Sequence, residues 1–237
     1  MKSNYYDTSV QLGTEFQKNN PKNWAGYDVV KYQDQIKDLV QRYNAKTILD
    51  YGCGKGLQYT ENLPWGMING AGLPLEQWTT FDKWLGVEVY KYDPCIPGLD
   101  IPPPDNIKFD GVICTQVLQT IPDADLPWVS EKLLSHTDKF CFISLNFQQV
   151  AKRKKFFYDP ALFKEPRTRE FFKQYFTSWP KEKLFWWFKD RMHYPNWADD
   201  QLNGTWTDLP KEWVGKYTYI ESIYGQPAKT STDNVRI

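Results

Sequence analysis

The chain has 237 residues, a length that suits one α/β domain with an elaboration or at most two small domains. Lysine plus arginine and aspartate plus glutamate number 29 each, so the formal net charge is zero. Without an excess of cations the protein has no general attraction for phosphate groups. The charge balance therefore argues against a dedicated nucleic-acid binder.

The cysteines and the first residues indicate which compartment to expect. The cysteines form no C-x-x-C pair and have no zinc-ligand spacing, so we expect free thiols in a reducing environment and no metal site. Residues 1–16 are polar and contain no apolar stretch of the kind found in signal peptides. No run approaches the ~18 apolar residues of a membrane span. These features predict a cytoplasmic protein without a membrane segment.

A helix and a buried strand are the first elements to expect. Over residues 28–43 apolar side chains recur at helical spacing, with Asp28 as the expected N-cap. Residues 47–51 form a short apolar run rich in β-forming residues, and a glycine-rich turn stops it. This pattern predicts a buried strand followed by a loop.

Three further strands and one helix follow. We expect strands over residues 86–92, 109–115 and 140–145, with a helix over residues 123–135. Strands that alternate with helices predict a doubly wound α/β fold. Its sheet should be mostly parallel and Rossmann-like, with helices on both faces.

Two connections depart from the regular alternation. Residues 93–109 hold five prolines and are too short for a full strand-plus-helix crossover, so one strand or helix must be reduced there. Residues 63–84 are long for a helix-to-strand connection. We interpret them as an insertion near the ligand-facing edge of the sheet.

The C-terminal half is rich in aromatic side chains. Residues 181–190 have a helical pattern that carries Phe185-Trp186-Trp187-Phe188, and residues 217–224 alternate as a closing strand would. No linker composition separates this part, so we expect one domain. It consists of an N-terminal helical segment, a ligand-binding core, and an aromatic-rich elaboration on the substrate side that caps the carboxyl ends of the strands (residues 1–45, 46–147 and 148–237).

A glycine-rich turn leaves the strand at residues 47–51 with the sequence Asp50-Tyr51-Gly52-Cys53-Gly54-Lys55-Gly56. Glycine lets the backbone turn tightly and come close to a ligand. A nicotinamide-type turn reads G-x-G-x-x-G and receives a pyrophosphate at a helix N-terminus. Here the spacing differs and an acid opens the motif. A carboxylate repels a pyrophosphate but attracts amino and sulfonium groups, which favours S-adenosylmethionine over NAD.

The next two strand ends offer further candidates for the same ligand. Asp93, followed by Pro94, ends the second strand, where an acid can accept both hydroxyls of a ribose. The third strand ends at Thr115-Gln116-Val117, which we expect to touch the methionine portion, because strand ends line the crevice of such sheets. The alternatives are an Asp-Pro turn initiator and an ordinary strand-to-helix loop.

Residues 43–145 resemble the class I S-adenosylmethionine-dependent methyltransferases. The stretch from Ile48 to Gly56 resembles motif I, Tyr92-Asp93-Pro94 resembles the acidic strand end that holds the ribose, and Phe109 to Leu118 resembles the motif IV region. The resemblance implies methyl transfer to an O or N nucleophile of a small-molecule acceptor, without an obligatory catalytic residue. The implied cofactor-binding residues are Asp50, Tyr51, Gly52, Cys53, Gly54, Asp93, Pro94, Thr115, Gln116 and Val117.

One stretch departs from this family. Many small-molecule members read D-V-L-E-H where this chain reads Gln116-Val117-Leu118-Gln119-Thr120. The missing acid and histidine leave open a catalytically silent protein that binds S-adenosylmethionine and acts as an interaction module. A second alternative is an RNA-directed methyltransferase that uses the basic run at residues 152–155 and exposed aromatic side chains to stack bases.

Overall fold

A computed structural model of the chain describes residues 2–65, 77–147, 169–180 and 183–190. In chain order its α-helices and strands are α1 (Asn4–Asn19), α2 (Gln33–Arg42), β1 (Thr47–Tyr51), α3 (Phe81–Leu85), β2 (Glu88–Tyr92), β3 (Phe109–Thr115), α4 (Leu126–His136), β4 (Thr137–Phe147), α6 (Arg169–Lys173) and β5 (Leu184–Asp190). Short 3-10 helices join them: η1 (Tyr27–Tyr32), η2 (Leu57–Tyr59), η4 (Leu118–Thr120), η5 (Asp123–Asp125) and η7 (Gln174–Phe176).

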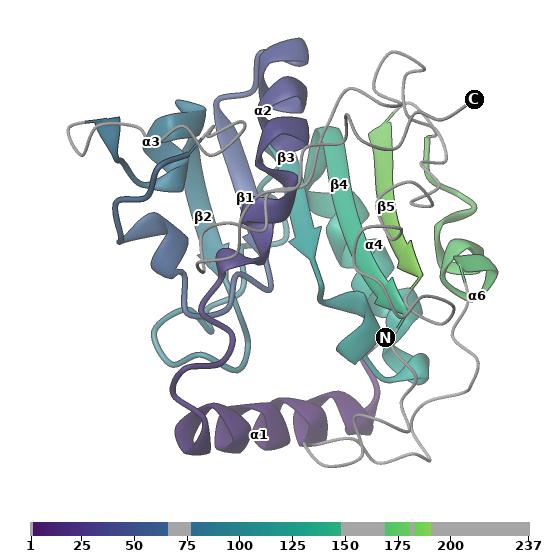
Figure 1. Cartoon of the computed structure of the whole chain (residues 1–237). Helices are drawn as coiled ribbons and strands as arrows, with labels where there is room; N and C mark the ends of the chain where they lie inside the picture. The colour runs from purple at the N-terminus through teal and green to yellow at the C-terminus, as the bar shows by residue number, and fades with distance from the viewer. Residues whose placement is uncertain (1, 66–76, 148–168, 181–182, 191–237) are drawn as a thin grey trace, which may run out of the picture.

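The strands form one sheet in the order β2-β1-β3-β4-β5, and every described pairing is parallel. This is one of the common doubly wound strand orders. The chain passes from β1 to β2 on one side and then crosses β1 to reach β3 on the other (Figure 1). The reversal places a topological switch point between the carboxyl ends of β1 and β3, where ligands bind in open α/β sheets.

Helices cover both faces of the sheet, as the sequence predicts (Figure 1). On one face α2 packs through Ile36 and Leu39 against strand residues such as Ile48. On the other face α4 packs through Val129 and Leu133, together with α6 and η7. Successive strand residues point to opposite faces, so alternate residues of one strand enter different core clusters. The α/β, Rossmann-like fold class is therefore confirmed.

The four strands predicted between residues 47 and 145 all form. The strand expected over residues 109–115 has those bounds as β3, and the strand expected over residues 140–145 is extended at both ends as β4. The proline-rich connection of residues 93–108 contains no helix and no strand, as expected from its length. Strands β1, β3 and β4 could be predicted because their apolar runs are buried on both faces, as is usual in parallel sheets.

Two helix predictions are wrong in detail. The helix expected over residues 28–43 begins as the 3-10 helix η1 with Gly26 at the cap position, and Asp28 instead pairs with Lys31 on the surface. Residues 181–190 were expected to be helical, but residues 184–190 form β5, which pairs in parallel with β4. A short continuous apolar run suits either a helix or a buried strand. Here its aromatic residues, which favour strands, complete the sheet.

The expected insertion at residues 63–84 is described at its two ends. Leu63 and Thr79 form an isolated antiparallel bridge, and the Trp65 indole donates a hydrogen bond to the Thr79 carbonyl at 2.8 Å. The rings of Trp65 and Phe81 lie 4.5 Å apart between centroids, in the core cluster that α2 covers. These described ends pack on a face of the sheet and do not line the ligand-facing edge. The expected strand at residues 217–224, the basic run at residues 152–155 and most of the aromatic C-terminal elaboration lie outside the described residues.

Helix α1 was not predicted as a separate element. Ser3 caps it by accepting a hydrogen bond from the Tyr5 amide at 3.1 Å. The helix lies across the end of the sheet toward which the strands point (Figure 1). Among the described residues, no helix is both long and apolar enough to cross a membrane.

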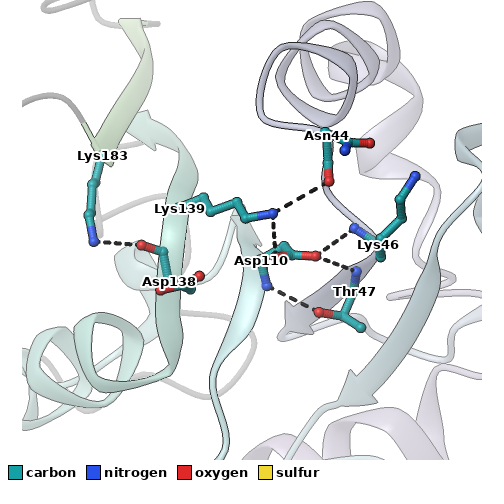
Figure 2. Close-up of polar contacts among 7 residues, drawn as sticks. All are labelled: Asn44, Lys46, Thr47, Asp110, Asp138, Lys139 and Lys183. Carbon is teal, nitrogen blue, oxygen red and sulfur yellow. Dashed lines mark hydrogen bonds and ion pairs between the residues drawn. The ribbon is translucent and has the colours of Figure 1, made fainter.

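The opposite, amino end of the sheet is held by Asp110 in β3 (Figure 2). Its Oδ2 accepts hydrogen bonds from the backbone amides of Lys46 at 2.6 Å and Thr47 at 3.2 Å. Its Oδ1 lies 2.7 Å from the Lys139 ammonium of β4. Burial raises the pKa of Asp110, but these hydrogen bonds together outweigh it, so the pKa lies below its ordinary value. Asp110 therefore links β1, β3 and β4.

We predict that Asp110→Ala lowers the free energy of unfolding by about 1–3 kcal/mol, because two backbone donors lose their acceptor. Asp138→Ala is the matched control: Asp138 is exposed, and Lys183 bonds to its backbone carbonyl at 2.5 Å, a contact that the substitution preserves (Figure 2). Urea unfolding at pH 7 should separate the two variants. The difference should shrink as the pH falls below about 4 and disappear below the lowered pKa of folded Asp110, where the carboxyl is protonated in both states. Equal losses in both variants would contradict the role of Asp110.

Candidate functional site

A cavity lies at the carboxyl ends of β1, β2 and β3, at the topological switch point, with α1 across it. Three groups of residues line it. From α1 and the segment after it come Tyr6, Ser9, Val10, Gly13, Trp24, Gly26 and Asp28. From the turns after β1 and β2 come Asp50, Gly52, Cys53, Gly54, Gln58, Asp93, Pro94 and Cys95. From the end of β3 and the loop beyond it come Thr115, Gln116, Val117, Thr120, Ile121 and Pro122.

The glycine turn has the left-handed backbone that its sequence requires. Gly52 and Gly54 have φ values of 84° and 60°, a region that side chains disfavour. A Cβ at Gly52 would meet the Val117 side chain at 2.2 Å, and one at Gly54 would meet the Trp24 carbonyl at 2.4 Å. The protein itself therefore fills the space that these two glycines leave. These glycines let the chain pack closely around the cavity. From the sequence alone, we expect them to make room for a ligand.

Neighbouring segments hold the turn on two sides. The Tyr92 carbonyl accepts hydrogen bonds from the amides of Gly52 at 2.7 Å and Cys53 at 3.1 Å, which attaches the turn to the end of β2. On the other side the Lys55 amide donates to the Trp24 carbonyl at 2.7 Å. The turn is thus fixed both to β2 and to the segment that follows α1.

Asp50 is a fully buried carboxylate at the end of β1. Its Oδ2 accepts hydrogen bonds from the Tyr59 hydroxyl at 2.7 Å and from the Gln58 amide at 3.2 Å. Its Oδ1 has no hydrogen-bond partner among the described residues. Burial raises the pKa of Asp50 to about 7, although the two hydrogen bonds oppose the rise, and the nearby Asp93 adds to it. A buried acceptor of this kind lacks a donor that a ligand can supply.

Asp93 is the second buried acid of the cavity, with 8% of its surface exposed. Its Oδ2 accepts a hydrogen bond from the Gly54 amide and its Oδ1 accepts one from the Cys95 amide, both at 2.9 Å. Burial raises its pKa, although both hydrogen bonds lower it. An ionised carboxylate offers about four acceptor positions, so each oxygen of Asp93 can still accept one more hydrogen bond.

The end of β3 carries a strained residue. Gln116 has φ = 60°, which is uncommon outside glycine and tends to occur at functional sites. Its side-chain amide donates to the Tyr32 hydroxyl at 3.2 Å and to the Ser144 hydroxyl at 3.3 Å, and its carbonyl accepts from Gln119 at 3.2 Å. These contacts hold Gln116 against β4 and η1 at the edge of the cavity.

The structure brings together every predicted site residue except Tyr51, whose neighbours Gly52 and Cys53 both line the cavity. The Tyr51 side chain packs in the core cluster on the α4 face, with its ring 5.0 Å from that of Tyr92. Thr115 and Val117 line the cavity at the end of β3, as expected.

The residues that α1 contributes to the cavity are not among the predicted site residues. Tyr6, Val10 and Gly13 follow one another at spacings of four and three, which is the spacing of one helix face. Together with Ser3 as an N-cap this pattern could have indicated an amphipathic helix. Gln58, which orients Asp50, lies within the sequence expected to be a loop and has no comparable signal.

The charges that line the cavity are all negative. Within the described part of the chain its charged lining residues are Asp28, Asp50 and Asp93, and no lysine, arginine or histidine lines it. Burial raises the pKa of the Cys53 thiol well above its ordinary value, so Cys53 is not an activated nucleophile. No group of three histidine, cysteine, aspartate or glutamate side chains in the described residues could hold a metal ion. The site therefore suits a neutral or cationic ligand.

Comparison with family models, with curated proteins and with solved structures gave no match. A function for this chain must therefore be argued from the site itself.

We predict that Asp50→Asn stabilises the ligand-free protein at pH 8 but not at pH 5. The folded pKa of Asp50, about 7, lies above the ordinary value of about 4, so the wild type loses stability as the pH rises from about 4 through about 7. Asparagine keeps the shape of the side chain and removes this ionisation. Urea unfolding at both pH values measures this effect. Asp100→Asn, at an exposed acid of the proline-rich connection, is the control. A pH dependence that is the same in Asp50→Asn and wild type would contradict the burial effect.

Proposed function

We propose that this protein is an S-adenosylmethionine-dependent methyltransferase that acts on a small-molecule acceptor. The observation that carries the proposal is the Oδ1 atom of Asp50, a fully buried carboxylate oxygen without a partner among the described residues, in a cavity at the switch point of the sheet. A second buried acid, Asp93, lines the same cavity. A ligand with a cationic end and a pair of hydroxyl groups matches these two acceptors.

The residues around Asp50 fit the amino-acid end of S-adenosylmethionine. The amino group would donate to Oδ1 of Asp50, and the Gln58 Oε1, which also lacks a partner among the described residues, adds a second acceptor beside it. Both atoms belong to cavity-lining residues. A donor with positive charge offsets the cost of ionising a buried carboxylate.

Asp93 fits the ribose. Its two oxygens already accept backbone amides, which fixes the orientation of the carboxylate, and each can accept one ribose hydroxyl in addition. Thr115, Gln116 and Val117, at the end of β3, would line the methionine portion.

The same features disfavour a pyrophosphate-containing cofactor. In such sites a helix N-terminus follows the glycine turn and receives the phosphates. Here the turn leads into η2, a three-residue 3-10 helix. Two buried carboxylates would repel a phosphate. The absence of cations from the described lining also disfavours RNA as the substrate.

When bound, S-adenosylmethionine supplies a methyl group on a sulfonium that is already activated for transfer. The chain then needs to align the two reactants and exclude water, which can provide much of the rate enhancement. We assign no catalytic residue. O-methylation and N-methylation are both compatible with this arrangement.

The alternative of a catalytically silent binding protein is favoured by one observation. The side chain of Gln116 is engaged with Tyr32, Ser144 and Gln119, so the protein holds it where many small-molecule methyltransferases have an acid. Tight cofactor binding without turnover on a panel of amines, phenols and carboxylic acids would support this alternative.

We predict micromolar binding of S-adenosylmethionine and S-adenosylhomocysteine to the wild type, measured by isothermal titration calorimetry. Asp93→Ala should weaken both ligands by roughly 10- to 100-fold, because the ribose hydroxyls lose their acceptor. Asp100→Ala, at an exposed acid of the same connection, should bind as the wild type does. Absence of binding by a folded wild-type sample that is free of co-purified ligand would overturn the proposed function.

We also predict that the affinity for S-adenosylmethionine rises as the pH increases through about 7, because Asp50 must be ionised to attract the cationic end. Tyr59→Phe removes a hydrogen bond that lowers the pKa of Asp50, so the midpoint should move to higher pH. The other titratable groups near Asp50 in the described part of the chain are Asp93, which raises its pKa, and the thiols of Cys53 and Cys114.

Tyr27→Phe is the matched control for this titration. Tyr27 donates its hydroxyl hydrogen bond to the exposed Glu61, away from Asp50. The pH midpoint of S-adenosylmethionine binding in Tyr27→Phe should equal that of the wild type. A midpoint that Tyr59→Phe leaves unchanged would contradict the role of Asp50 as the counter-ion.

A further inference from the structure

Helix α1 lies across the cavity on the side opposite the strands and leaves it partly open. Four of its residues, Tyr6, Ser9, Val10 and Gly13, line the cavity, whose other walls come from residues 24–28, the sheet and its loops. Figure 1 shows the helix (purple) lying across the strand ends. Helix α1 therefore forms the wall that faces Asp50 and Asp93 across the cavity.

The N-terminal end of α1 is attached by a compact pair of hydrogen bonds. The amide and the hydroxyl of Ser3 donate to the two carboxylate oxygens of Asp125, at 2.7 Å and 2.8 Å. Asp125 is fully buried at the start of α4. This contact joins the first turn of α1 to the layer on the α4 face of the sheet.

At its C-terminal end, α1 continues into residues 20–26, which contact the glycine turn. The rings of Phe16 and Trp24 lie 5.4 Å apart, and the Trp24 carbonyl accepts the Lys55 amide. The next residue, Ala25, accepts a hydrogen bond from the Leu57 amide at 3.0 Å. Residues 20–26 are therefore anchored independently of α1 and can act as its fixed end.

The middle of α1 rests on the loop that carries Asp93. A Cβ at Gly13 would lie 2.6 Å from the Cys95 sulfur and 3.5 Å from the Cys95 Cβ. The helix backbone thus touches Cys95, two residues from Asp93. This contact couples the position of α1 to the ribose side of the cavity.

Helix α1 has few buried side chains for its length of 16 residues. Tyr6 is the only large apolar side chain of α1 that is buried. Gln17 is also buried, and neither of its amide atoms has a hydrogen-bond partner among the described residues. Few buried apolar contacts and unsatisfied polar groups characterise segments that open locally at low cost.

We propose that α1 is a hinged cover of the nucleoside cavity, which turns about residues 20–26 and must leave its seat on Cys95 and Asp125 for a ligand to enter or leave. The nature of the ligand rests on the proposed function. The cover itself rests on the contacts of α1 and can be tested without any ligand.

The test locks the cover with a disulfide. In Gly13→Cys the new Cβ lies 3.5 Å from the Cys95 Cβ, which is within the range of about 3.5–4.5 Å for disulfides. Oxidised glutathione takes up the two electrons and two protons of the thiol pair and leaves as two reduced glutathione molecules. Gly13→Ser is the matched control, because it adds a side chain of similar size that cannot form the bond.

The readout is alkylation of Cys53 by iodoacetamide, followed by peptide mass spectrometry. Cys53 lines the cavity beneath α1, whereas Cys114 and Cys141 are fully buried in the sheet and react only when the protein unfolds. In the reduced protein and in Gly13→Ser, Cys53 should react faster than Cys114 and Cys141. In the locked protein its rate should fall at least about tenfold, toward theirs. If the disulfide leaves the alkylation rate of Cys53 unchanged, α1 does not act as a cover.

Ser3→Ala tests the same inference without a disulfide. It removes the cap of α1 and one hydrogen bond to Asp125, so it should raise the Cys53 rate severalfold and leave the Cys114 and Cys141 rates unchanged. Equal acceleration at all three cysteines would indicate global destabilisation and contradict a hinged cover.

S-adenosylhomocysteine gives a second readout on the same proteins. The locked Gly13→Cys protein should bind and release it at least about tenfold more slowly than its reduced form. Failure of the wild type to bind this probe would overturn the proposed function, while the alkylation rates would still decide whether α1 is a cover. If the disulfide leaves the rates of binding and release unchanged, α1 does not act as a cover, and the proposed function is unaffected.

Discussion

The carboxylate of Asp93 is the group on which the geometry of the cavity depends. Its two oxygens accept the Gly54 and Cys95 amides, so the end of β2 and the turn after β1 are bound to one side chain. Without it, the buried Gly54 amide and the partly buried Cys95 amide would lose their acceptor, at a cost of about 1–3 kcal/mol for a buried donor. The Asp93 carboxylate therefore fixes both the glycine turn that lines the cavity and the position of Cys95, which contacts α1.

The sequence contains much of this arrangement because the relevant signals are local. An apolar run that ends in an acid and closely spaced glycines predicts both β1 and the turn after it, and β3 is predicted with its observed bounds. Parallel strands place their carboxyl ends along one edge of the sheet. Asp50, Asp93 and Thr115 could therefore be expected to meet, although 65 residues separate the first from the last.

The parts that the sequence did not predict depend on contacts between distant segments. Residues 184–188 are apolar enough for a helix or a strand, and only the open edge of β4 decides in favour of β5. The close packing of Gly54 against Trp24 depends on the segment after α1, which no local pattern places on the turn. The environment of Asp50 is also non-local, because Tyr59 can reach it only after η2 folds back over β1.

The missing helix between β2 and β3 has a consequence for the solubility of the fold. The strand order makes β2 an edge of the described sheet, and with a proline-rich loop in place of a crossover helix it is half exposed along most of its length. A free parallel edge can pair with a strand of another molecule and start aggregation. Glu88 and Lys91 place charges of both signs within this short strand, and a docked peptide would have to bury them. The charges that interrupt the apolar pattern of β2 thus disfavour the addition of a further strand at this edge.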